Sequence, residues 1–226
     1  MTFGPRYGAT MGEAIKLRDG SEVTLRPLTP DDRERIRRAF DRLSPESRYR
    51  RFFVSLRELS DGLLDILTDV DHDVHEALVG LEPQSEEIVG VARYVRMLEE
   101  PERAEASVAV VDDWQGRGLG RALLERLVTR ARDMGVSRFV AFTQADNHRA
   151  VEVMSHLGPT TSSLRGDLVE LDIELPKHGI GAPLATALRA AAGALLDVQP
   201  LAGRIWQRAR EMPGAARLPR GRPGRR

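Results

Sequence analysis

The sequence predicts an α/β protein built on one mixed, mostly antiparallel sheet that is flanked by helices. Alternating apolar residues predict three consecutive strands at about residues 76–81, 87–97 and 103–111. The turns between them, at 83–85 and 99–101, have lengths that suit antiparallel hairpins. A glycine-rich loop then leads directly into a helical pattern, so the apolar period changes from 2 to 3.6.

The other elements follow from helix-start signals and periodicity. Thr29-Pro30 and Ser44-Pro45 each place a proline at the first helical position behind a capping residue. Gly135 and Gly158 are natural residues just beyond helix C-termini. The predicted elements are a strand at about 22–28, helices at about 30–43, 45–53 and 60–68, the three strands above, a helix from the loop to Met134, a strand at 137–143, a helix at 147–157, and short strands at 160–165 and 167–175.

Changes in composition predict the domain organisation. Residues 1–21 lack periodicity and are expected to be a disordered leader, with Met11 as a second candidate for the start. Residues 22–176 carry the elements above and form the domain. Residues 177–226 form a C-terminal extension, which comprises an Ala-rich helix at about 183–196 and a basic, disordered tail at 199–226.

The composition is that of an ordinary soluble protein. The chain has 226 residues, of which 41% are hydrophobic and 30% are charged. The absence of cysteine excludes a thiol nucleophile, a thiolate metal site and disulfides, which fits a reducing cytoplasm. No apolar run approaches the roughly 18 residues of a membrane span.

The formal net charge of zero conceals a basic tail. From Gln199 onward, eight arginines face only one acidic residue, Glu211. Such a tail can bind nucleic acid or anionic lipid through phosphates, but a solvated tail is the favoured interpretation. The Ala-rich helix is expected to pack on the domain or on a second subunit, which leaves a homodimer open.

The loop Gln115-Gly-Arg-Gly-Leu-Gly120 has the properties of an anion site. The unpaired amides of a helix's first turn point outward, and Gly118 and Gly120 have no Cβ to shield them. A Rossmann loop would need glycine where Arg121 stands. A P-loop would need a lysine followed by serine or threonine, and the only lysines are Lys16 and Lys177.

The remaining pattern, Q-x-x-G-x-G, resembles the acetyl-CoA pyrophosphate loop of the GNAT superfamily of N-acetyltransferases, and the order of elements is that of the GNAT fold. Residues 24–32 look like the common opening of such domains. Residues 43–53 and Asp71-His-Asp73 are similar to the subgroup that holds bacterial protein-lysine acetyltransferases. The resemblance covers about residues 22–176 and implies acetyl-CoA as co-substrate, without a metal.

The resemblance also implies which residues bind acetyl-CoA. The backbone of Val110 and Val111 would bind the pantetheine arm, and Asn147 would contact the CoA arm unless it is only a helix cap. Arg117 and Arg121 would add positive charge beside the loop, unless either is a solvated helix-start arginine. The pyrophosphate would be held by Gln115, Gly116, Gly118, Leu119, Gly120 and Arg121.

Glu105 is the candidate catalytic base, because it matches the glutamate that many GNAT enzymes use. The alternative is a strand glutamate paired to Arg103 or Arg93. Met154 stands where many relatives carry a tyrosine as general acid, so solvent is expected to protonate the leaving thiolate. His72 and His75 lack a third ligand at metal spacing and are expected to be structural or to face the substrate.

These features predict an enzyme that moves an acetyl group from acetyl-CoA to a primary amine by direct transfer in a ternary complex. The acceptor is either a small molecule or a protein lysine. The alternative is a non-catalytic acyl-CoA sensor or partner-binding module. Asp112 and Asp113 are expected only to form the turn before the loop.

Overall fold

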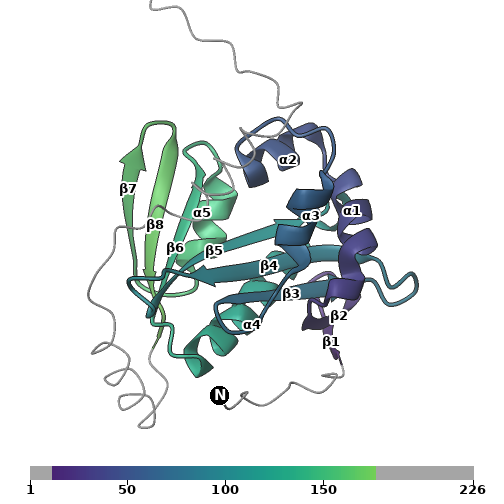
Figure 1. The fold of residues 1–226 in the computed structure, drawn as a ribbon, viewed down its shortest axis with the longest axis horizontal. Coiled ribbons are helices and arrows are strands. Elements are labelled where there is room, and N and C mark those ends of the chain that lie inside the picture. The colour runs from purple at the N-terminus through teal and green to yellow at the C-terminus, as the bar shows by residue number, and fades with distance from the viewer. Residues whose placement is uncertain (1–11, 177–226) are drawn as a thin grey trace, which may run out of the picture.

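The computed structural model describes residues 12–176, and a single sheet organises them (Figure 1). Its strands follow the order β1-β2-β3-β4-β5-β6-β8-β7. All neighbouring pairs are antiparallel except β5 and β6, which run parallel, so the predicted mixed sheet is confirmed. The strands are β1 (Glu13–Lys16), β2 (Glu22–Pro27), β3 (His75–Leu81), β4 (Ile88–Arg96), β5 (Arg103–Val110), β6 (Arg138–Gln144), β7 (Thr160–Arg165) and β8 (Leu168–Glu174).

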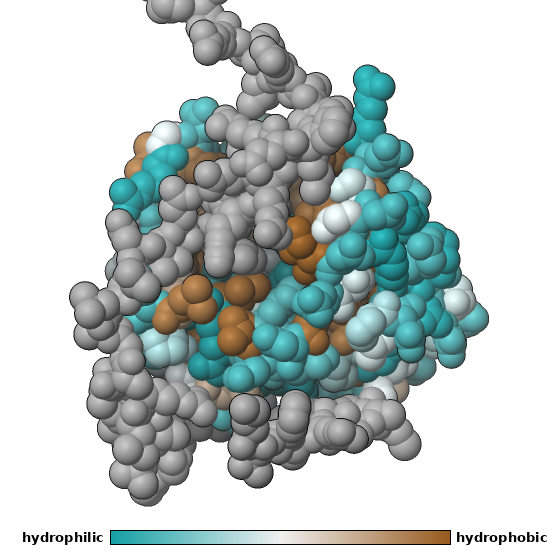
Figure 2. All heavy atoms as spheres, viewed as in Figure 1, coloured by the Kyte–Doolittle hydropathy of each residue, from teal (hydrophilic) through white to brown (hydrophobic). Residues whose placement is uncertain are grey.

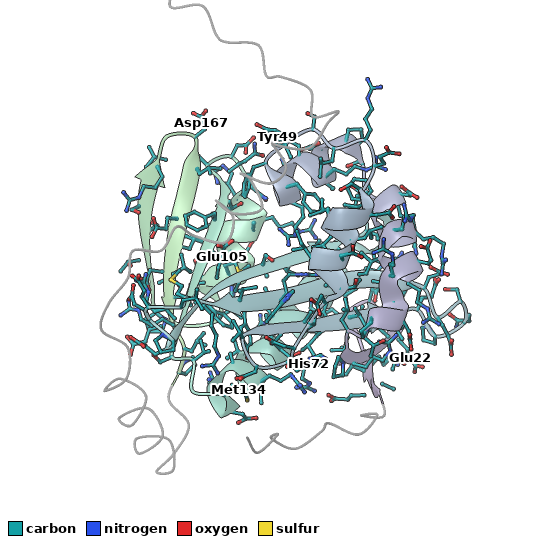
Figure 3. All side chains as sticks on the ribbon, viewed as in Figure 1. Glu22, Tyr49, His72, Glu105, Met134 and Asp167 are labelled. Atoms are coloured by element: carbon teal, nitrogen blue, oxygen red, sulfur yellow. The ribbon has the colours of Figure 1, made fainter. Side chains whose placement is uncertain are left out.

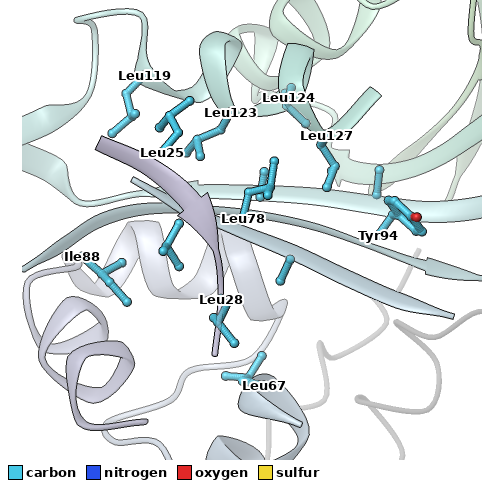
Figure 4. Close-up of a cluster of buried hydrophobic side chains, with 14 of the residues drawn as sticks. Leu25, Leu28, Leu67, Leu78, Ile88, Tyr94, Leu119, Leu123, Leu124 and Leu127 are labelled. Atoms are coloured by element: carbon cyan, nitrogen blue, oxygen red, sulfur yellow. The ribbon is translucent and has the colours of Figure 1, made fainter. Parts of the chain in front are cut away.

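Helices cover both faces of this sheet. One face, over β3 to β5, is covered by α1, α2 and α3, which we call the helical cap, and the opposite face is covered by α4 (Figures 1 and 4). A 3₁₀ turn at Pro30–Asp32 precedes α1, so the regular helix begins three residues later than predicted. The helices are α1 (Arg33–Asp41), α2 (Pro45–Phe52), α3 (Asp61–Thr68), α4 (Leu119–Asp133) and α5 (His148–Ser155).

The prediction of a disordered leader at residues 1–21 is wrong for residues 12–21. Strand β1 lies there and pairs antiparallel with β2, with Ala14 opposite Thr24. Only Ile15 of this strand packs against the core, so hydrogen bonding to β2 rather than an apolar pattern holds it in place. The turn that follows closes with a hydrogen bond from the Leu17 amide to the Ser21 carbonyl, 2.8 Å long.

The predicted C-terminal helix and basic tail lie outside the described residues. Between residues 12 and 176, no helix is both long enough and apolar enough to cross a membrane.

The hydrophobic core has one layer on each face of the sheet (Figure 4). Burying a leucine or isoleucine side chain contributes about 1.5–3 kcal/mol, so the two layers supply the main stabilisation of the domain. On the α4 side the layer includes Leu119, Leu123, Leu124 and Leu127, and on the cap side it includes Leu28, Leu67 and Ile88.

Helix α4 comes close to the sheet because two strand residues have no Cβ. A Cβ on Gly90 would lie 2.9 Å from Leu123 Cδ1, and one on Gly80 would lie 3.0 Å from Leu119 Cδ1. Protein interiors are packed as densely as organic crystals, so these leucines cannot move aside without disturbing their neighbours. The two glycines therefore set how near the start of α4 lies to the sheet.

We expect Gly90→Ala to lower the free energy of unfolding by about 1–3 kcal/mol, because overpacking shifts the leucines of α4. Gly120→Ala is the control, since its new Cβ would meet Val110 Cγ2 at an ordinary 3.6 Å. Urea unfolding of the parent and both variants measures the effect. Equal stability of the two variants would contradict the packing argument.

Candidate active site

A cavity of about 470 Å³ opens where β5 and β6 separate. Only residues 103–105 of β5 pair with β6, at residues 138–140, although both strands continue further. The cavity is also walled by α2, by the start of α4 and by α5. In Figure 2, hydrophobic residues gather near the middle of the visible face. The edge of β5 beyond Glu105 therefore borders open space instead of another strand.

Backbone groups of β5 and the residue that follows it alternate between β4 and this cavity. The Val111 amide donates a hydrogen bond of 3.0 Å to the Val89 carbonyl, and Val111 itself is buried away from the cavity. The Val110 carbonyl lies on the other side and accepts a 3.1 Å hydrogen bond from Gln115 Nε2. Of the two residues expected to bind a ligand arm, only Val110 lines the cavity.

The glycine loop presents the start of α4 to the same cavity. Gly116 and Gly118 have φ of +84° and +100°, which side chains other than glycine rarely adopt. Gly118 is the N-cap of α4 and provides no capping side chain, so the amides of the first turn remain available to an anion. Leu119 and Gly120 line the cavity beside them.

Two arginines that the sequence did not indicate lie at this loop. A Cβ on Gly116 would be 3.0 Å from Arg149 Nη2, and one on Gly118 would be 3.4 Å from Arg18 Nε. Both arginines line the cavity, and Arg18 reaches it from the segment expected to be disordered. Together with the first-turn amides they make this end of the cavity attractive to phosphate.

The two arginines predicted within the loop differ in position. The Arg117 guanidinium donates a 2.7 Å hydrogen bond to the Asp113 carbonyl and stacks 4.7 Å above the Trp114 ring, outside the cavity wall. Arg121 lines the cavity and forms an exposed ion pair of 2.8 Å with Glu125. Of these two arginines, only Arg121 lines the cavity.

Glu105 lies on β5 at the centre of the molecule, between the helical cap and the β6–α5 side (Figure 3). It is half-buried, lines the cavity and stands opposite Val95 in the sheet. Arg103, a partner considered from the sequence, instead bonds to Glu100 and Asp172. Glu105 therefore reaches the cavity on the cap side, at the opposite end from the glycine loop.

Arg93, the other partner considered, is buried below α3. Its Nη1 donates to the Leu67 carbonyl at 3.1 Å and lies 3.3 Å from His75 Nε2. Burial and the nearby positive charge of Arg51 lower the pKa of Arg93 to about 9. Burial and the charge of Arg93 lower the pKa of His75 to about 4, so His75 is neutral at pH 7 and can accept from Arg93.

His72 has a different role from His75. Its Nδ1 lies 2.8 Å from an oxygen of buried Glu76, whose other oxygen accepts from Arg130 at 2.7 Å. Neither His72 nor Glu76 lines the cavity, so this cluster anchors the start of β3.

Asn147 is a helix cap that also lies at the cavity. Its side-chain oxygen accepts a 3.2 Å hydrogen bond from the Ala150 amide and so caps α5, and the residue also lines the cavity. Met154, about two turns further along α5, is buried in the cavity wall. Its thioether has no acidic proton, so this position provides no general acid.

Asp112 does more than form a turn. Its carboxylate accepts hydrogen bonds from the Ser44 amide, the Ser44 hydroxyl and the Ser47 hydroxyl, at 2.7, 2.9 and 2.9 Å. Gln115 Nε2 adds a 3.2 Å contact to Ser47 Oγ. Desolvation raises the pKa of Asp112, but these hydrogen bonds outweigh it and hold the pKa below its usual value. The contacts fix the start of α2 to the glycine loop.

We expect Asp112→Ala to lower the free energy of unfolding at pH 7 by about 1–2 kcal/mol, because three hydrogen bonds to a charged group are lost. Asp113→Ala is the control, since it loses one exposed ion pair, worth up to about 1 kcal/mol. The Asp112 contribution is complete above the unfolded pKa of about 3.9 and disappears as the pH falls through the lower folded value. Urea unfolding at pH 7 and in acid measures both effects, and a larger loss in Asp113→Ala would contradict the assignment.

The Acetyltransferase (GNAT) family model matches residues 35–158. Acetyltransferase PA5475 of Pseudomonas aeruginosa is 38% identical to this chain over 144 residues, which are 63% of this chain and 77% of that protein. Acetyltransferase Pat of Mycolicibacterium smegmatis is 35% identical over 164 residues, which are 72% of this chain and 48% of that protein. The chain thus spans about half the length of that second relative.

Solved structures agree with these matches. The GNAT domain of S. lividans PAT has a TM-score of 0.69 at 30% identity, with 75% of this chain and all of that chain covered. The fold is shared with yncA of Salmonella typhimurium, solved with its cofactor acetyl-CoA, at a TM-score of 0.56 and 22% identity over 70% of this chain and 96% of that chain. The family model covers more than half of the chain and the Pseudomonas relative is well covered, so the chain belongs to the GNAT acetyltransferase family and is an acyltransferase.

Proposed function

We propose that this protein transfers an acetyl group from acetyl-CoA to a primary amine in a ternary complex. The observation that carries the proposal is that the uncapped first turn of α4 and the Glu105 carboxylate border the same cavity. One end of the cavity suits a pyrophosphate and the other offers a base. The absence of cysteine favours direct transfer over a thioester on the enzyme, and it fits a cytoplasmic location.

Acetyl-CoA would extend from the glycine loop along β5. The first-turn amides, with Arg18, Arg121 and Arg149 nearby, would bind the pyrophosphate. The edge of β5 up to Val110 would then bind the amide groups of the pantetheine arm as a neighbouring strand does. Gln115 has to release the Val110 carbonyl for that contact. This path directs the thioester toward Glu105.

Glu105 would accept one proton from the ammonium group of the acceptor, directly or through water. The free amine then attacks the thioester carbon, and a β5 amide stabilises the oxyanion that forms. The attack forms the C–N bond. Collapse of the tetrahedral intermediate then breaks the C–S bond, and the second amine proton passes to solvent. Because Met154 cannot donate, solvent would supply the proton that the CoA thiolate takes up.

Two classes of acceptor have support. The segments 43–53 and 71–73, together with the relatives named Pat, favour a protein lysine. A 54-residue match at 44% identity to a protein named L-amino acid N-acyltransferase MnaT of Escherichia coli favours a small amine. A non-catalytic acyl-CoA sensor is the competing function, and it would bind acetyl-CoA without releasing thiol when amines are added.

We expect Glu105→Gln to reduce turnover by roughly 10²- to 10⁴-fold, because the amide keeps the shape and loses the base. Affinity for acetyl-CoA should remain close to that of the parent. The residual rate should rise with pH as free amine accumulates. Thiol release across a pH series, with calorimetry for binding, measures both effects. Turnover like that of the parent at neutral pH would show that Glu105 is not the base.

We expect Gly120→Glu to abolish acetyl-CoA binding while the domain stays folded. A Cβ fits at this position, so the added carboxylate would enter the cavity beside Val110 and repel the pyrophosphate. Gly120 is a cleaner test than Gly118, whose φ of +100° strains any other residue. Gly120→Ala is the matched control and should bind more tightly than Gly120→Glu in calorimetry. Parent-like binding by Gly120→Glu would refute the loop assignment.

A further inference from the structure

The acceptor half of the cavity contains more positive charge than acetyl transfer to a simple amine requires. Arg51 of α2 and Arg93 of β4 both line the wall near Glu105. Burial lowers the pKa of Arg51, while the Glu105 carboxylate acts in the opposite direction. Even with the Glu105 carboxylate counted, an ammonium group would enter this region against a net positive charge, which is unfavourable unless the acceptor brings a negative charge of its own.

The two guanidinium groups have unused donors. Arg93 uses Nη1 for the Leu67 carbonyl and His75, and its Nε and Nη2 have no hydrogen-bond partner among residues 12–176. Arg51 packs 5.2 Å over the Phe52 ring and donates no hydrogen bond to any described residue. Arg93 is buried and Arg51 is half-buried in the cavity wall, and removing a guanidinium charge from water is costly unless the charge has a partner. These donors therefore indicate a place for an anion.

Ser107 adds a third donor beside them. It stands directly opposite Arg93 in the β4–β5 pairing, two residues from Glu105 and on the same face of the sheet. Arg51, Arg93 and Ser107 also border a second cavity of about 60 Å³ beneath the helical cap, adjoining the large one. A single water needs a cavity of only about 10–15 Å³ on this measure, so the space can hold a group of carboxylate size.

We infer that the acceptor is a small amine that carries a carboxylate close to its amino group, as an α-amino acid does, and that Arg51, Arg93 and Ser107 bind this carboxylate. The inference rests on the proposed function and selects one of its two acceptor classes. Bidentate guanidinium–carboxylate contacts are strong and directional. Fixing the carboxylate at the cap side of β5 holds the neighbouring amino group near Glu105, where its proton is removed. In a protein substrate, a lysine places its amino group several bonds away from any neighbouring carboxylate.

The first test compares matched acceptors with the full-length protein. Thiol release from acetyl-CoA is measured with each common L-amino acid, its amide and its decarboxylated amine. We expect kcat/KM for at least one amino acid to exceed that for its amide and for its decarboxylated amine by about 10- to 100-fold. This is the effect expected from hydrogen bonds between charged groups, which the two compounds without a carboxylate cannot form. Lysine peptides with neutral or acidic neighbours form a further arm. Turnover restricted to lysine peptides, or amides that match their acids, would overturn the inference while leaving acetyl transfer intact.

The second test assigns the preference to residues. Arg51→Gln and Ser107→Ala should each reduce the ratio of kcat/KM for the acid to that for its amide, and Arg57→Gln, an exposed arginine outside the cavity, should preserve it. If Arg51→Gln or Ser107→Ala acted only by disturbing Glu105, kcat/KM would fall equally for the acid and for its amide, and their ratio would not change. That result would also overturn the inference. Absence of thiol release with every amine, despite acetyl-CoA binding, would instead refute the proposed function on which the inference rests.

Discussion

The close packing of α4 on a part of the sheet without Cβ atoms is the constraint on which the rest of the site depends. Gly80 and Gly90 admit Leu119 and Leu123, and the position of these leucines fixes the first turn of the helix. The first amide of that turn belongs to Leu119, whose side chain is part of the core. The position of the first-turn amides and the folding of the domain thus rely on one set of contacts, so the loop end of the cavity is held in place by the hydrophobic interior.

Strand β5 diverges from β6, and the space between them is a cavity with two ends, one of which is the start of α4. The parallel pairing stops at Glu105, and the edge of β5 beyond it borders the cavity instead of a strand, although the Val110 carbonyl accepts a hydrogen bond from Gln115. One end offers amides with Arg18 and Arg149, and the other combines Glu105 with Arg51 and Arg93. Helix α2 connects the two ends, because its start bonds to Asp112 beside the glycine loop and its Arg51 lies near Glu105. These contacts hold the two ends at a fixed separation.

Local signals account for what could be predicted from the sequence. Strong periodicity and caps such as Ser44 gave nearly every element within a few residues. Strand β1 was missed because its residues are mostly exposed and carry no apolar pattern. Other features depend on contacts between distant segments. The different directions of Val110 and Val111 require the strand register, and Arg51 meets Arg93 only once the cap has folded over the sheet. No single-sequence pattern encodes either relationship.

The edge strand β1 is linked directly to the glycine loop. The Arg18 amide, just after β1, donates a 3.2 Å hydrogen bond to the Arg117 carbonyl of the glycine loop. Two segments almost a hundred residues apart therefore hold each other in place. Any ligand that binds only the ordered loop also favours the ordered edge, by thermodynamic linkage. Opening of β1 and dissociation of the nucleotide end of the ligand then become parts of one cooperative equilibrium, so amide hydrogen exchange at this remote strand would report occupancy of the site.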